Sequence, residues 1–234
     1  MIKLVTEIPK LNVESAAYTK ICCGAAAYAP YQKIALFGVQ TDENECVTAI
    51  ASLIDNVMTL FNNGADLFEL GEFIKYISPN GIFTDSTTAN ALNLKIETPC
   101  DVLIIRPPYS TENAAEDAEL SLDYAVDTVA SRLNIGVRDV FKADLSHRIR
   151  HDSATFVTTE HSAGFVLYSG NFAIISGIAV SMASEKSGVG SATLKAILKK
   201  IGNRALLVCA EDKNVPFYLK NGFTILERCA YCRI

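Results

Sequence analysis

The chain has no tryptophan, only three histidines and no excess of positive charge. Its formal net charge is −5 over 234 residues, so we expect no basic surface that would attract a phosphate backbone. Nucleic acid is therefore not an expected partner. Half of the residues are hydrophobic, which is enough to bury the core of one large domain or two small ones.

Long uninterrupted apolar runs are also missing. Glu7 and Pro9 break the apolar stretch that an export signal near the N-terminus would need. The longest apolar run, 164–180, contains several polar residues and falls short of the ~20 apolar residues of a spanning helix. It is typical of two buried strands joined by a turn. We therefore expect a cytoplasmic protein without a membrane partner.

The seven cysteines do not form a recognisable pattern of pairs. An odd number of scattered cysteines in a chain with no expected export signal argues against a disulfide framework. Cys229 and Cys232 have the CxxC spacing, but no second Cys/His pair accompanies them, so we expect burial on a terminal strand rather than metal or redox chemistry. No metal site is predicted.

The order of the expected elements is similar in the two halves of the chain. Segment 106–119, RPPYSTENAAEDAE, is rich in turn-forming and acidic residues and predicts a boundary between a domain at 1–110 and a domain at 111–234. Each half predicts three consecutive strands, a helix and a further strand, which raises the hypothesis of a duplication. The ranges are 33–42, 46–55, 57–63 and the helix 66–78 in the first half, and 153–160, 163–170, 172–180, 205–210 and 223–232 in the second, where the helix follows the strand 172–180.

Helix signals support these ranges. Asp66 and Glu69 have the spacing of a capping box at the start of the first of these helices. In the second half, Leu194, Ile197, Leu198 and Ile201 recur with helical spacing, and two further helices are expected between 120 and 151.

The segment SMASEKSGVGSATL, 181–194, places Gly188 and Gly190 just before the helix of the second half. Helix N-termini present unpaired N–H groups and a partial positive charge, so a glycine-rich entry predicts an anion site. A Walker loop is excluded because neither glycine is followed by Gly-Lys at the required spacing. A dinucleotide fingerprint, with Glu211 as the ribose-binding acid, remains a weaker alternative, because Thr193 stands at the third glycine position.

Two motifs resemble those of the GNAT-type N-acetyltransferases. The hexad 185–190, EKSGVG, resembles the pyrophosphate loop [RQ]-x-x-G-x-[GA] of that family, and FYLKNGF, 217–223, resembles its aromatic-Tyr-x-Lys-x-Gly-Phe ending. The resemblance covers about 120–234. It implies an α/β (α+β) GNAT fold, with a mixed, mostly antiparallel central sheet flanked by helices. The first half would be a structural partner or a degenerate GNAT-like copy.

The same resemblance implies a cosubstrate and a reaction. Acetyl-coenzyme A would be bound and its acetyl group transferred to a primary amine by direct attack, with Tyr218 in the position of the general acid. The residues implied in coenzyme binding are Ile178, Val180, Lys186, Ser187, Gly188, Val189, Gly190, Ser191, Asn214 and Phe217.

Two departures from the family pattern leave alternatives open. Glu185 replaces the usual Arg or Gln, so it either weakens coenzyme binding or points to solvent. The strand 172–180 carries no acid, which leaves His147, His151, Glu160, His161 or a water chain as the base. A non-catalytic acyl-CoA-binding or protein-interaction module is therefore the alternative function.

The acceptor and the assembly are less defined. The acceptor is a small-molecule or peptide amine that the sequence does not specify, and a homodimer is left open. The basic run 147–151, HRIRH, favours a solvated helix end over a cationic wall of the acceptor site.

Overall fold

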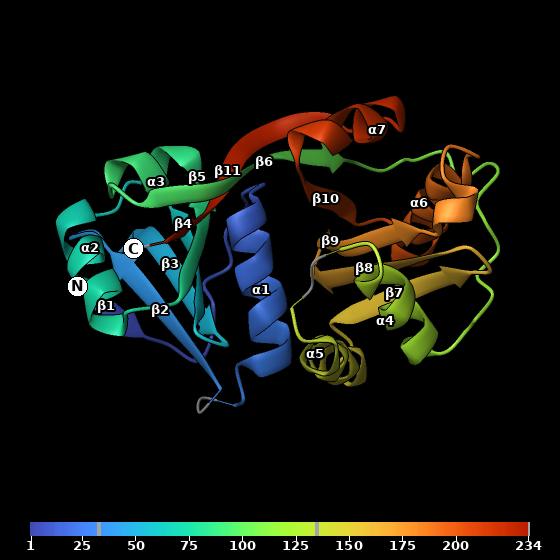
Figure 1. Cartoon of the computed structure of the whole chain (residues 1–234). Helices are drawn as coiled ribbons and strands as arrows, with labels where there is room; N and C mark the ends of the chain where they lie inside the picture. Colours follow the sequence, from blue (N-terminus) through green and yellow to red (C-terminus); the bar gives the residue numbers. More distant parts are fainter. Residues whose placement is uncertain (32–33, 134–135, 234) are drawn as a thin grey trace. The chain divides into compact units, whose positions relative to one another are not determined.

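The computed structural model describes residues 1–31, 34–133 and 136–233 (Figure 1). The chain forms two compact units. The first unit consists of Met1–Leu103, Cys209–Lys220 and Thr224–Ile234, and the second of Ile104–Val208 and Asn221–Phe223. The last helix and strand of the chain thus belong to the first unit by their contacts. Contacts do not test whether 1–110 and 111–234 fold as separate domains, so that division stays a prediction.

The first unit is built on a mostly antiparallel sheet. Its strands follow the order β1-β2-β3-β4-β5-β11-β6, in which only β4 and β5 are recorded as a parallel pair. Its elements are β1 (Ile2–Leu4), α1 (Ala16–Tyr28), β2 (Ala35–Thr41), β3 (Val47–Ile54), β4 (Val57–Asn62), α2 (Leu67–Ile77), β5 (Gly81–Asp85), α3 (Ser86–Ala91), most of β6 (Lys95–Ile105), η2 (Asp212–Asn214), α7 (Val215–Lys220) and β11 (Thr224–Arg233). Leu60, Leu70 and Ile82 are fully buried in a core between the sheet and α2.

The second unit has the strand order β10-β9-β8-β7, with an antiparallel meander and one parallel pair. Its elements are α4 (Leu122–Ala130), α5 (Arg138–Arg150), β7 (Ala154–Thr159), β8 (Ser162–Ser169), β9 (Phe172–Val180), η1 (Met182–Ser184), α6 (Val189–Ile201) and most of β10 (Ala205–Ala210). Helices α4 and α6 both contact β8. The apolar face predicted for α6 is confirmed, because Leu194, Ile197, Leu198 and Ile201 are all buried.

The two halves of the chain repeat one succession of elements. The first half runs β2-β3-β4-α2-β5-α3-β6 and the second half runs β7-β8-β9-α6-β10-α7-β11. In each, the third strand pairs in parallel with the fourth over a short ladder, Val57–Thr59 with Gly81–Phe83 and Phe172–Ile174 with Ala205–Leu207. This common topology supports the duplication hypothesis, while a common origin of the two halves stays a prediction.

Several local predictions can be compared with the structure. The apolar run 164–180 forms parts of β8 and β9 joined by a turn, as predicted. Cys229 and Cys232 are both buried on β11, which confirms their predicted place, and none of the seven cysteines is in a disulfide. No helix within the described ranges is both long and apolar enough to cross a membrane. The same residues contain no group of three or more His, Cys, Asp or Glu side chains arranged to hold a metal ion.

Candidate functional site

The glycine-rich loop of the second unit leaves the start of α6 open. Gly188 is the N-cap residue of α6, with φ 89°, and no side chain caps the helix. Only glycine adopts this left-handed conformation freely, and a Cβ at Gly188 would meet no atom within 4 Å. The exposed Lys186 also has a positive φ, of 58°. The loop therefore presents a bare backbone, as the spacing of the glycines predicts.

The first turn of α6 supplies backbone donors for a ligand. Its first helical hydrogen bond joins the Ala192 N–H to the Gly188 carbonyl, at 3.1 Å. For the N–H groups of Val189, Gly190 and Ser191, no acceptor is recorded in the part of the chain that the structure describes. These residues are half-buried, so a ligand can reach them. Such a cluster of N–H groups at a helix N-terminus can bind an anion.

A chain of hydrogen-bonded hydroxyl groups holds the first turn of α6 in place. Thr193 Oγ1 donates to the Val189 carbonyl at 2.8 Å and lies 2.6 Å from Ser162 Oγ, which lies 2.6 Å from Thr159 Oγ1. Since the carbonyl can only accept, Ser162 must donate to Thr193 and Thr159 to Ser162. The His161 N–H completes the chain by donating to Thr159. The first turn of α6 is thereby joined to the hairpin of β7 and β8.

Glu185 does not leave an uncompensated charge beside the loop. Its carboxylate forms an ion pair with the guanidinium of Arg132, which lies just after α4. The side chains are 44% and 29% exposed respectively, so the pair lies at the surface but is not fully solvated. Glu185 is exposed, as one of its two expected outcomes has it, but it is also paired, and whether it weakens coenzyme binding stays a prediction. Arg132 lies 53 positions earlier in the sequence, and no local pattern indicated it.

Strand β9 has an edge that β10 does not cover. The parallel ladder between β9 and β10 ends at Ile174 and Leu207 in the recorded register. Farther along, Ser176 is skipped in the pairing with β8, which marks a β-bulge. Ile178 and Val180, the predicted pantetheine contacts, lie beyond both features and are half-buried. No strand partner for these two residues on the β10 side is recorded in the described ranges, so their backbone groups there are available to a ligand.

Helix α7, in the first unit, contains the predicted general acid. Tyr218 is 6% exposed, and its ring meets Phe217 edge-on with centroids 5.0 Å apart. Burial raises the pKa of Tyr218 above its usual value, and the nearby Cys209 thiolate raises it further. The phenol thus remains a proton donor. Gly222 has φ 88°, the left-handed conformation expected after the helix.

The other predicted residues are more exposed or differently paired. Asn214 is exposed and ends η2, which leads directly into α7, and no capping hydrogen bond from its side chain is recorded in the described ranges. Glu160 and His161 are exposed at the turn between β7 and β8. Lys186 and Ser187 are exposed in the loop.

The basic run at the end of α5 differs from the prediction of a solvated helix end. Arg148 is only 7% exposed, and its Nε donates to both carboxylate oxygens of Asp144, at 2.8 and 2.9 Å. The solvated interpretation is therefore wrong for Arg148, whose charge is compensated within the helix. His147 and His151 have ring centroids 4.4 Å apart on the same helix.

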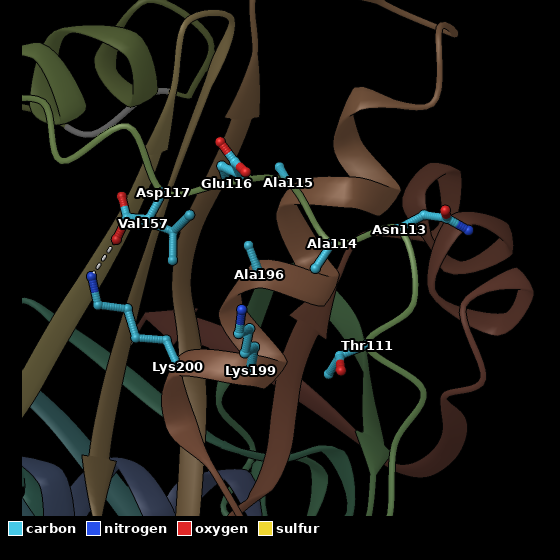
Figure 2. Close-up of a pocket in the computed structure, with 10 residues that line it drawn as sticks. All are labelled: Thr111, Asn113, Ala114, Ala115, Glu116, Asp117, Val157, Ala196, Lys199 and Lys200. Carbon is cyan, nitrogen blue, oxygen red and sulfur yellow. Dashed lines mark hydrogen bonds and ion pairs between the residues drawn. The ribbon is translucent and has the colours of Figure 1, made fainter.

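A separate surface hollow of about 730 Å³ lies against the C-terminal part of α6 (Figure 2). Its walls come from Thr111, from residues 113–117, from Val157 and from Ala196, Lys199 and Lys200. Figure 2 shows Lys200 reaching toward Asp117, with which it forms an ion pair. None of the residues of the glycine-rich loop lines this hollow. This hollow is therefore distinct from the glycine-rich loop.

Comparisons with known proteins identify the fold. No protein-family model matches the chain, and no curated protein matches it in sequence. An acetyltransferase of the GNAT family from Colwellia psychrerythraea is similar in structure, with a TM-score of 0.54, 14% identity, and coverage of 99% of this chain and 98% of that one. A GCN5-related N-acetyltransferase from Sphaerobacter thermophilus has a TM-score of 0.57 and 10% identity over 92% of this chain and 90% of that one.

A tandem GNAT protein from the clavulanic acid biosynthesis pathway is similar over both halves. Its TM-score is 0.57 at 11% identity, with coverage of 99% of this chain and 98% of that one. At such low identity, these similarities establish the fold alone. The chain has the GNAT fold, as its two motifs predict, and the similarity extends over the first half as well as the second.

Proposed function

We propose that the chain is a GNAT-type N-acetyltransferase that transfers the acetyl group of acetyl-coenzyme A to a primary amine by direct attack. The observation that carries this proposal is the uncapped start of α6 at Gly188. The residues present fit the coenzyme, since no acceptor for the three N–H donors is recorded among the described residues, Gly188 has open space where a Cβ would be, and Arg132 compensates the charge of Glu185.

The proposal assigns binding roles to backbone groups. The pyrophosphate of the coenzyme would accept hydrogen bonds from the loop and the first turn of α6, where the helix dipole also favours negative charge. The uncovered edge of β9 at Ile178 and Val180 would hydrogen-bond the pantetheine arm. The full set of proposed contacts is Ile178, Val180, Lys186, Ser187, Gly188, Val189, Gly190, Ser191, Asn214 and Phe217.

Tyr218 would act in the chemical step. As the amine nitrogen bonds to the carbonyl carbon and the carbon–sulfur bond breaks, the departing sulfur takes a proton from the Tyr218 phenol. The raised pKa of Tyr218 keeps that proton available at neutral pH. The amine must also lose a proton, for which His147, His151, Glu160, His161 or a water chain remain the candidates.

Calorimetric titration with acetyl-coenzyme A tests the proposal. Gly188→Trp should fill the open loop and abolish the binding that the unaltered protein shows. Gly64→Trp is the matched control, because Gly64 also precedes a helix, has φ 89°, and a Cβ at this position would meet no atom within 4 Å. Absence of binding by the unaltered protein would refute the proposed cosubstrate. Equal loss in both variants would point to unfolding, which circular dichroism would reveal.

The lack of an acid on β9 favours a second candidate, a non-catalytic module that binds acyl-coenzyme A. An assay for the free coenzyme thiol separates the two functions. Release of thiol that depends on an added primary amine supports transfer. Tight binding without release, across a panel of amines, supports the module.

A further inference from the structure

The end of α4 lies close to the coenzyme loop within the second unit. A Cβ at Gly177 of β9 would lie 3.0 Å from Val129 Cγ1 and 3.4 Å from Leu133 Cδ1, so α4 and the turn after it approach this strand closely. Arg132 stands next to Leu133, and its backbone N–H donates to the Val129 carbonyl at 3.1 Å. From this fixed backbone its side chain extends to Glu185, the first residue of the hexad.

The guanidinium of Arg132 retains capacity for a ligand. Arginine has five N–H donors in a planar fork, and the contact with Glu185 is made through Nη2 to a single carboxylate oxygen, Oε1. The side chain is 29% exposed, so a bound ion can reach the remaining donors. A planar fork of this kind matches the oxygens of a phosphate. Without Arg132, the charges of Glu185 and Lys186 would cancel, and the loop would have no net positive side chain.

We propose that Arg132 binds the pyrophosphate of the coenzyme at this loop, through the guanidinium donors that its contact with Glu185 leaves available. The inference rests on the proposed function. It differs from a purely structural role, in which the ion pair only joins the loop to α4. In that case, removing either partner has the same consequence. In the proposed arrangement the two partners have unequal roles.

Two ligands and three variants test this difference by calorimetry. Arg132→Met should weaken the affinity for acetyl-coenzyme A roughly ten- to a hundredfold, the range for a lost charge-assisted hydrogen bond. It should also reduce the dependence of that affinity on salt. The affinity for S-acetyl-pantetheine, which lacks the pyrophosphate, should be unchanged. The affinity of Arg132→Lys for acetyl-coenzyme A should lie between those of the unaltered protein and Arg132→Met, because lysine keeps the charge and loses the planar fork of donors.

Glu185→Gln should not weaken the binding of acetyl-coenzyme A. It should leave the affinity for acetyl-coenzyme A unchanged or higher, because the guanidinium is no longer shared with a carboxylate. The inference is overturned if Glu185→Gln binds as weakly as Arg132→Met, or if Arg132→Met binds as tightly as the unaltered protein. Should Arg132→Met fail to fold, the comparison of Arg132→Lys with Glu185→Gln decides by the same criterion.

Two further measurements are needed, one on a control variant and one on the unaltered protein. Arg138→Met removes another arginine of the second unit, one that pairs with Asp123 and Asp127, and should not change the affinity. If the unaltered protein binds no acetyl-coenzyme A, the proposed function itself fails. If it binds and only the role of Arg132 is refuted, the proposed function stands.

Discussion

The helices that follow the third meander strand differ at their first turn, α2 in the first half and α6 in the second. The side chain of Asp66 closes the start of α2 by accepting from the N–H groups of Phe68 and Glu69, at 2.9 and 3.1 Å. At α6, Gly188 has no side chain to do so. The repeated order of elements therefore has a capped helix start in the first half and an uncapped one in the second, where we propose the anion site.

The first half also lacks a counterpart of the proposed acid. Helix α3, which occupies the place of α7 in the repeated order, has the sequence STTANA and no tyrosine. Below α2, Gln40 holds Asp66 by accepting from its N–H at 2.9 Å and donating to its carbonyl at 3.3 Å. The first half thus has a closed and internally satisfied helix start. This supports its interpretation as a structural partner rather than a second catalytic centre.

The largest expected effect concerns Tyr218, which has no equivalent in α3. Tyr218→Phe should lower kcat by about a hundredfold or more, the contribution typical of a general acid, while the affinity for acetyl-coenzyme A stays nearly the same. Steady-state kinetics with a responsive amine, together with calorimetry, measures both quantities. An unchanged kcat would show that Tyr218 is not the general acid. The second half would then lack this catalytic group on α7, as the first half lacks it on α3.

The pH dependence of kcat checks the same assignment. Because burial raises the pKa of Tyr218, the phenol keeps its proton as the pH rises past about 10, the value of an unperturbed tyrosine. The activity that needs this proton should therefore persist up to that pH. A falling limb centred well below pH 10 that disappears in Tyr218→Phe would contradict the raised pKa.

A smaller effect, on stability, is expected from the hydroxyl chain that holds the start of α6, as Gln40 holds the start of α2. Thr193→Val removes the donor to the Val189 carbonyl and leaves the buried Ser162 hydroxyl without its acceptor. The unfolding free energy should fall by about 1–3 kcal/mol in denaturant titration. Thr193→Ser keeps the hydroxyl and should cost less. A larger loss in Thr193→Ser than in Thr193→Val would show that the methyl group, and not the hydrogen bonds, holds the turn.

The contrast between the loops was partly accessible from sequence. A glycine at positive φ and a helix start are local demands, so Gly188 and the apolar face of α6 could be predicted from residues a few positions apart. The ion pair of Glu185 with Arg132 depends on how α4 packs on β9, and no pattern in the sequence specifies that approach. The pairing of β11 with β5 is equally non-local.

The capping box predicted at α2 is half right for the same reason. Asp66 caps the helix, but Glu69 does not reach back to the Asp66 N–H, which donates to Gln40 instead. The Glu69 carboxylate accepts from the Ile2 N–H at 2.7 Å and from Gln40 Nε2 at 2.8 Å. Partners that are distant in sequence, Ile2 and Gln40, replace the contact within the helix start. The spacing of Asp66 and Glu69 alone could not indicate this.

The smallest expected effect would open the closed helix. Asp66→Ala should lower the unfolding free energy by about 0.5–2 kcal/mol, because the N–H groups of Phe68 and Glu69 lose their acceptor. Asp66→Asn retains an oxygen acceptor and should stay near the unaltered stability in the same denaturant titration. Neither change should alter the affinity for acetyl-coenzyme A, since the proposed site is at α6. A second binding event in Asp66→Ala would show that one carboxylate is all that keeps the first half from binding the coenzyme.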